Sequence, residues 1–287
     1  FLPNFKALIG NAKITISVKN FPSQNSTATA LSPFTVASIT PVIVDTQTTN
    51  IILGINFQFD SSKTTETTTS LASLVSSTLR NYNTSNLAQF DGAFRHSKVT
   101  GLIDDTDTSI TSNITTVTLA HDLSPTLSTS TAYTIQLNNA FYNPHSGHNS
   151  TSGGVLASTG FKVSGDTTNV QFFDDDGAGN IRRYILVAGV RQNQDSTAGT
   201  ITYSTGEIKI SSINIISVEN VDEVASSVIR LTVTPDSLDI IPVRNQILKI
   251  DFVNTNINGS LDTIATGDSS SGTTATTTST YVTPSSY

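Results

Sequence analysis

Hydrophobic and polar residues alternate along much of this chain, which is the pattern of β-strands that bury one face. In Ala12–Phe21, isoleucine and valine alternate with lysine, threonine and serine. In Asn50–Asp60, the side chains of Ile55, Phe57 and Phe59 share one face. The same pattern predicts two further strands, Asn113–Leu123 and Ala132–Tyr142.

A helical period interrupts this pattern between residues 70 and 103. Apolar residues recur there at steps of three and four, first over Ser70–Tyr82 and again after the break at Asn83–Asn86. The second run contains Leu87, Phe90, Phe94, Val99, Leu102 and Ile103. We therefore expect residues 34–142 to form an α+β domain, with a helical hairpin on a mostly antiparallel sheet.

The rest of the chain predicts strands, a linker and a polar arm. Residues 143–154 are dense in turn formers and mark a linker, and residues 155–253 form a β-rich hairpin region. Its clearest hairpin reverses at Thr205–Gly206. Residues 1–33 supply a strand and a polar connector. Residues 254–287 form a Ser/Thr-rich arm that cannot build a core, so we expect a neighbouring subunit to hold it.

Composition narrows the class of protein. The 287 residues are only 13% charged, with a net charge of −7, and no lysine or arginine cluster is present to bind nucleic acid. No apolar run is long enough to span a membrane, and no signal peptide opens the chain. Cysteine is absent, which excludes disulfides and thiolate chemistry. Because Phe1 is not a translation start, we expect a processed chain or one piece of a longer protein.

The acidic segment FFDDDGAGNIRRYILV, residues 172–187, resembles a calcium-binding loop at first sight. With Asp174 at position one and Asp176 at position three, Ala178 falls at position five and Ile185 at position twelve. Neither can ligate calcium through its side chain, and the bidentate acid is missing. We predict a hairpin turn instead, with aspartates accepting from local amides and glycines at positive φ.

Other candidates for chemistry are weaker. His145 and His148 lie in a polar loop without nearby carboxylates, and no serine has a plausible histidine and aspartate arrangement. Asp104, Asp105 and Asp107 belong to one turn, whereas glycosidase carboxylates come from separate elements across a cleft. The sequence therefore predicts no catalytic residue, no bound metal and no cofactor.

One longer segment carries a family resemblance. Residues 87–113, LAQFDGAFRHSKVTGLIDDTDTSITSN, resemble a signature of the large baseplate wedge subunit of T-even-type contractile-tailed phages, related to the baseplate J-like family. The matching positions are Phe94, Ser97, Lys98, Ile103, Asp104, Asp107, Ile110 and Asn113. The acidic turn and the hairpin at Thr205–Gly206 look like those of cyanophage members. The similarity is ordered over roughly residues 34–252.

This resemblance implies the C-terminal half of a structural, non-enzymatic subunit in the tail baseplate of a virion. Such a subunit pairs with another copy and joins wedge and hub proteins into a ring, with no nucleic-acid or membrane partner. We expect the acidic hairpin, with Asp174, Asp176, Arg182 and Arg183, to contact a neighbouring subunit. By alternation, one of the two arginines faces the sheet and the other faces outward.

Two other classes of protein remain as alternatives. The first is a calcium-dependent adhesin or surface-layer β module, which would share the Thr/Ser-rich composition and would bind calcium at Asp174 and Asp176. The second is a glycan-degrading tail enzyme, which would need two carboxylates that converge in a groove.

Overall fold

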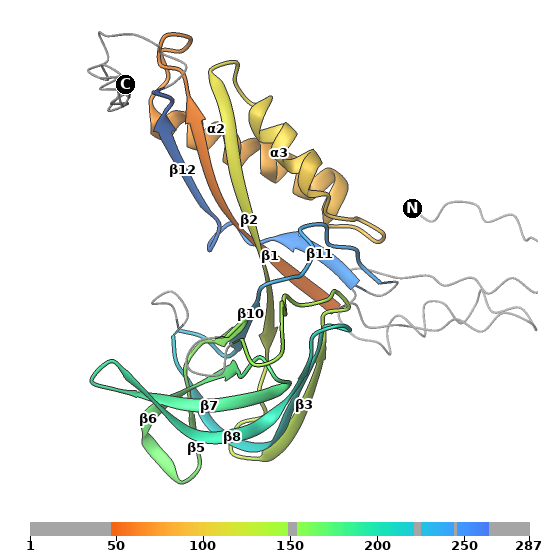
Figure 1. Ribbon diagram of the computed structural model, residues 1–287, viewed down its shortest axis with the longest axis vertical. Coiled ribbons are helices and arrows are strands. Elements are labelled where there is room, and N and C mark those ends of the chain that lie inside the picture. Colours follow the sequence, from red (N-terminus) through yellow and green to blue (C-terminus); the bar gives the residue numbers. More distant parts are fainter. Residues whose placement is uncertain (1–46, 149–153, 221–224, 244–245, 264–287) are drawn as a thin grey trace, which may run out of the picture. The chain divides into compact units, whose positions relative to one another are not determined.

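Strands dominate the fold of this chain. The computed structural model describes residues 47–148, 154–220, 225–243 and 246–263, which contain twelve strands, two α-helices and one π-helical turn (Figure 1). About half of the described residues lie in strands. All twelve strands belong to one hydrogen-bonded network. The predicted α+β class, a helical hairpin on a sheet, is therefore wrong.

The first strands form the sheet that carries the helices. β1 (Gln47–Phe59) pairs antiparallel with β2 (Ile110–Leu123), from Asn50 opposite Ala120 to Phe59 opposite Ile110. Along the other edge of β1 lie β11 (Gln246–Ile250) and β12 (Asn256–Leu261), and β12 runs parallel to β1. The two predicted strands, residues 50–60 and 113–123, are confirmed.

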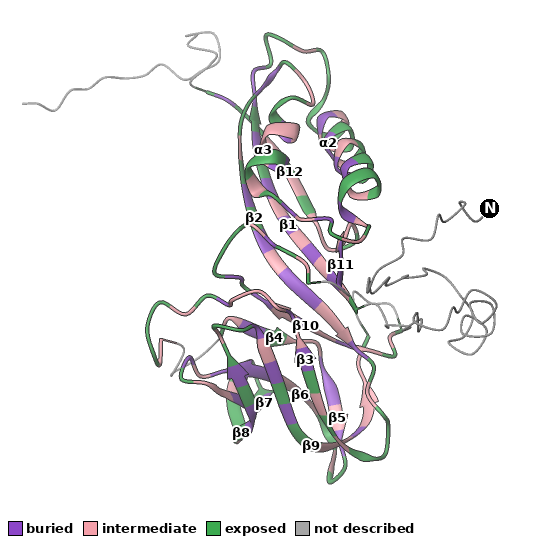
Figure 2. Cartoon of the chain, turned by 90° about the vertical axis from the view of Figure 1, so that its right-hand side faces the viewer, coloured by how far each residue is buried: buried purple, intermediate pink, exposed green. Residues whose placement is uncertain are grey.

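The helices cover one face of this sheet (Figures 1 and 2). These elements are α2 (Thr68–Tyr82), the π-helical turn η2 (Asn83–Leu87) and α3 (His96–Asp104). The Thr67 hydroxyl caps α2 by accepting a hydrogen bond from the Ser70 amide at 3.2 Å. The buried side chains of α2 and β1 belong to one core, which contains Leu71, Val75, Leu79, Ile51, Leu53, Ile55 and Phe57.

The second helix is shorter than its apolar period predicts. It begins at His96, whereas the predicted run starts at Leu87. Phe94 instead forms an isolated β-bridge with Ile240, with amide-to-carbonyl distances of 2.9 and 3.0 Å. The three- and four-residue spacing was thus produced by a π-helical turn, a bridge and a short helix, all of which bury apolar side chains against one core.

A closed five-stranded barrel forms the second part of the network. Its strands pair in the order β6-β5-β9-β8-β7, and pairing of β6 with β7 completes the circle. They are β5 (Phe161–Val163), β6 (Asp166–Asp175), β7 (Asn180–Val187), β8 (Val190–Thr202) and β9 (Glu207–Val218). The predicted hairpin is confirmed, because β8 and β9 reverse at Thr205–Gly206, with Gly206 at φ 69°.

Three short strands complete the described network. β3 (Ser130–Gln136) pairs with β9, so the predicted strand over residues 132–142 is confirmed in its first part. β10 (Ile229–Val233) pairs with β2 on one side and with β4 (Leu156–Ser158) on the other. β10 therefore joins the helix-covered sheet to the barrel by continuous strand pairing.

Several predictions fall outside the described residues. These are the strand at Ala12–Phe21, the connector to residue 33 and most of the Ser/Thr-rich arm, residues 264–287. The domain boundaries stay a prediction, although β11 and β12 follow the barrel in sequence and pair beside β1. Within the described ranges, no helix has the length and apolar character needed to cross a membrane.

Candidate functional site

The acidic segment forms the hairpin between β6 and β7, as predicted. At its turn the Asp176 carboxylate accepts hydrogen bonds from the Ala178 amide at 2.7 Å and from the Asn180 amide at 2.9 Å. Gly177 and Gly179 adopt φ of 74° and 106°, where a side chain would be strained. Burial acts to raise the pKa of Asp176, but the hydrogen bonds from Asn180 and Ala178 outweigh it and lower that pKa. The carboxylate therefore builds the turn.

Behind the turn lies a buried ion pair. The β6–β7 register sets Asp174 opposite Arg182, whose Nε and Nη2 donate to the two carboxylate oxygens at 3.2 and 2.7 Å. The exposed fractions of the two side chains are 5% for Arg182 and 2% for Asp174. The guanidinium of Arg191 also pairs with Asp174 and stacks on the Tyr184 ring, 3.7 Å from its centroid. Two cations thus share one carboxylate.

Asp175, next in the chain, is buried as well. Its carboxylate accepts from the Leu156 amide at 2.8 Å, the Gly177 amide at 3.2 Å and the Tyr203 hydroxyl at 2.7 Å. The pKa of Tyr203 is raised far above its usual range, mainly by burial and then by the hydrogen bond to Asp175. Sequence reasoning missed this pair, because nothing in the spacing of residues 175 and 203 indicates that they meet.

The four predicted interface residues have different roles in the structure. Arg182 and Asp174 are buried and bind each other, while Asp176 serves the turn. Arg183 points the other way, with 20% of its side chain exposed, and contacts Gln171 Oε1 at 2.5 Å and Asp195 at 3.9 Å. The two arginines lie on opposite faces of β7, as alternation predicts, but both are mostly buried and bind partners within the chain. The predicted subunit contact itself stays a prediction.

The other candidates for chemistry also have structural roles. Asp107 accepts from the amide and hydroxyl of Ser109 at 2.8 and 2.6 Å, and Asp104 accepts from the Asn113 side chain at 2.7 Å. His145 and His148 lie edge to face, with ring centroids 5.7 Å apart. Within the described ranges, no group of three or more histidine, aspartate or glutamate residues could hold a metal ion.

A second charged cluster joins three strand regions. Arg230 on β10 donates from Nε to Asp122 on β2 at 2.7 Å and from Nη1 to Asp251, directly after β11, at 3.0 Å. Sequence reasoning missed this cluster because Asp122 and Arg230 are 108 residues apart in the chain. It stabilises the place where β10 joins β2.

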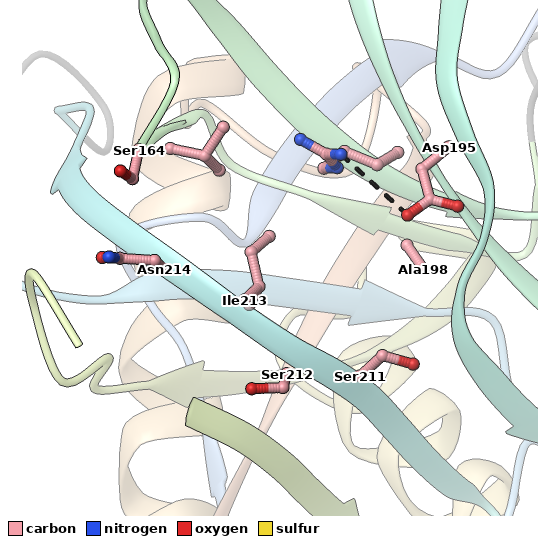
Figure 3. Close-up of a pocket in the computed structure, with 9 residues that line it drawn as sticks. Ser164, Asp195, Ala198, Ser211, Ser212, Ile213 and Asn214 are labelled. Atoms are coloured by element: carbon pink, nitrogen blue, oxygen red, sulfur yellow. Dashed lines mark ion pairs between the residues drawn. The ribbon is translucent and has the colours of Figure 1, made fainter. Parts of the chain in front are cut away.

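Strands of the barrel line a polar pocket of about 200 Å³ (Figure 3). It opens between β8, which supplies Asp195 and Ala198, and β9, which supplies Ser211, Ser212 and Asn214. Arg183 of β7 also lines the pocket and lies 3.9 Å from Asp195 as an ion pair. The pocket holds one pair of opposite charges, three serine hydroxyls and an amide.

Comparison with known families gives a match to the part of the helix-covered sheet from β1 to β2. Residues 48–122 match the family described as baseplate structural protein gp6, C-terminal domain III. The chain is located in the tail baseplate of a virion. The match runs from β1 to β2, covers about a quarter of the chain and includes the segment Leu87–Asn113. A search among curated proteins found no significant match.

Proposed function

We propose that this chain is a structural subunit of a contractile phage tail baseplate. It pairs with another copy, links adjacent wedges into a ring around the tail hub, and catalyses no reaction. The observation that carries this proposal is the match of residues 48–122 to a baseplate structural protein domain. Three finer parts of the proposal go beyond this match: the wedge role, the self-pairing and the cyanophage-like origin. They rest on the resemblance of residues 87–113 to the wedge subunit family.

The open face of the helix-covered sheet supports contact with protein partners. Opposite the helices, Asp122 near the end of β2 pairs with Arg230 of β10. The other outward side chains of β12, β1 and β2 carry no charge. Among them Asn56 and Asn258 hydrogen-bond at 3.4 Å, and Ile114 has an exposed fraction of 72%. A neutral face loses little hydration energy when it is buried, and the cores of protein interfaces are depleted of charge. This face is therefore suited to a neighbouring subunit.

The internal use of charge supports a scaffold role. Asp174, Asp175 and Arg182 are buried and satisfied within the chain, so they are poorly placed to act on a substrate. They stiffen the hairpin on which Arg183 lines the polar pocket. We keep the acidic hairpin as a proposed subunit contact, with Arg183 as the member that a partner can reach.

Electron microscopy of tails that carry an affinity-tagged copy of this chain tests the proposal. We expect the label in a ring at the baseplate, and sedimentation of the purified chain to show a dimer at micromolar concentration. Label confined to another part of the particle would overturn the proposal. Calorimetry with calcium compares this proposal with the alternative of a calcium-dependent adhesin or surface-layer module. Strong calcium binding by the native chain, lost in Asp174→Asn, would favour that alternative.

A further inference from the structure

The barrel is open along part of one seam. β8 and β9 pair only from Gly199 opposite Ile210 to Thr202 opposite Glu207. Before Gly199, β8 pairs with β7 alone, while β9 beyond Ile210 continues along β3 and β5. Within the described residues, one edge of β8 over residues 191–198 therefore lacks a partner strand. Free strand edges of this kind accept extended polypeptide by strand addition.

The polar pocket lies at this seam and has an unused acceptor. Ser211 and Asn214 line it from β9, and Asp195 lines it from β8 (Figure 3). Asn214 Oδ1 is buried and has no hydrogen-bond partner among the described residues. A buried acceptor without a donor is unfavourable by about 1–3 kcal/mol. A donor from an inserted side chain or backbone amide would relieve that cost.

One segment of this chain has the pattern of the missing strand. Residues 12–21 alternate Ile14, Ile16 and Val18 with polar residues that include Lys13 and Lys19. An isolated strand is unstable, so a strand of this pattern needs a sheet edge. The first 44 residues carry three lysines and no acidic residue, which leaves a net charge of −10 on residues 45–287. The segment and the rest of the chain are therefore complementary in charge.

We propose that residues 12–21 of a second copy add to the open edge of β8 and place a polar side chain in the pocket. Residues 22–46 connect this segment to β1 and can extend by roughly 80 Å at about 3.3 Å per residue, enough to reach another molecule. This strand exchange, in which each copy lends residues 12–21 to another, joins the copies through backbone hydrogen bonds. Asp195 then lies beside the face of the added strand that carries the lysines. This inference deepens the self-pairing in the proposed function and rests on it.

The absence of cysteine from the native chain makes the exchange directly testable. Chains of residues 1–287 carrying Ser17→Cys are mixed with chains of the same length carrying Ser211→Cys under mild oxidation. We expect a disulfide-linked heterodimer on a non-reducing gel. The matched control replaces Ser211→Cys with Ser73→Cys, an exposed serine on α2 that lies away from the seam. The proposal requires a clearly higher yield for the Ser211→Cys mixture.

Two further measurements separate the outcomes. Ile16→Asp should reduce the cross-linked yield several-fold while the circular dichroism spectrum of the chain stays unchanged. If sedimentation shows dimers but cross-linking never exceeds the control, the self-pairing stands and the strand exchange is wrong. If the double variant Ser17→Cys, Ser211→Cys gives only an internally linked monomer, the segment pairs with its own chain and the exchange between copies is wrong.

Discussion

Asp174 stabilises the folded chain from a buried position, although an aspartate in an acidic turn is expected at the surface. Its carboxylate lies between the guanidiniums of Arg182 and Arg191 and is almost fully buried. A buried charge without its counter-charge is far more unfavourable than the intact pair is favourable. The stability of the hairpin therefore depends on keeping both partners, which makes the pair a sensitive point of the barrel.

We expect Arg182→Met to lower the free energy of unfolding by about 3–5 kcal/mol, because it leaves Asp174 buried beside a single cation. Arg183→Met is the matched control on the same strand, where a partly exposed ion pair is worth about 1 kcal/mol or less. Urea denaturation followed by circular dichroism measures both. Equal losses for the two variants would show that the Asp174 pair has no special role.

Tyr203 gives the fold a dependence on alkaline pH. Its pKa is raised by burial and by Asp175, so the folded state keeps the phenolic proton more tightly than the unfolded state does. This contribution to stability is fully present below the ordinary tyrosine pKa of about 10 and is lost as pH rises above it. We expect the urea midpoint to fall between pH 9 and pH 11.

The variant Tyr203→Phe should make this alkaline fall shallower, since it removes one of the ionising groups. Tyr82 and Tyr184 also have raised pKa values, mainly through burial, so some fall will remain. A slope that is unchanged in Tyr203→Phe would contradict the role assigned to the Asp175 hydrogen bond.

At the scale of elements, the β7–β8 hairpin has an unusual turn residue. Val187 pairs with Val190, and the two residues between them, Ala188 and Gly189, adopt φ of 52° and 80°. Positive φ at both central positions defines a type I′ turn, which favours asparagine or glycine at the first position. Alanine is strained there because its Cβ approaches the carbonyl oxygen.

Ala188→Gly should therefore raise the free energy of unfolding by about 1 kcal/mol, because it removes this strain. Gly189→Ala is the opposite change at the neighbouring position and should lower stability by a similar amount. Urea midpoints of the two variants provide the measurement. A loss of stability in Ala188→Gly would mean that added freedom of the unfolded chain outweighs the relieved strain.

The comparison of sequence and structure shows which physical signals are local. Alternation correctly predicted β1, β2 and the β8–β9 hairpin, since each strand buries one face. Barrel closure depends on which strands pair, and no local pattern encodes the contact of β6 with both β5 and β7. The fold class was wrong because strands, five of them closed into a barrel, outweigh the two helices, and the bridge at Phe94 explains only the late start of α3.

The candidate site was predictable only in its local parts. The Asp176 turn followed from turn chemistry, and the opposite directions of Arg182 and Arg183 followed from alternation. The partners Arg191 and Tyr203 come from strands further along the chain, so their contacts with the acidic run could not be read from spacing. The sequence therefore indicated the hairpin but not its buried charge cluster.

For the molecule as a whole, the matched region does not contain all of its own sheet. β1 has β11 and β12 along one edge, and β2 has β10 along its far edge. Buried side chains of those later strands, among them Leu231, Val233, Leu248 and Ile250, belong to the same core as β1 and α2. The Asn83 side chain also accepts a hydrogen bond from the Ile250 amide at 2.9 Å.

We therefore expect residues 48–122 alone to remain unfolded or to aggregate. This fragment would expose the edge of β1 that β11 and β12 cover and the edge of β2 that β10 covers, and such unpaired edges promote aggregation. Residues 47–263, which retain every described strand, serve as the control and should fold. Circular dichroism and the dispersion of amide NMR signals distinguish the two outcomes. A well-dispersed spectrum from residues 48–122 would show that α2, α3 and two strands suffice, and that the returning strands add partners without completing the core.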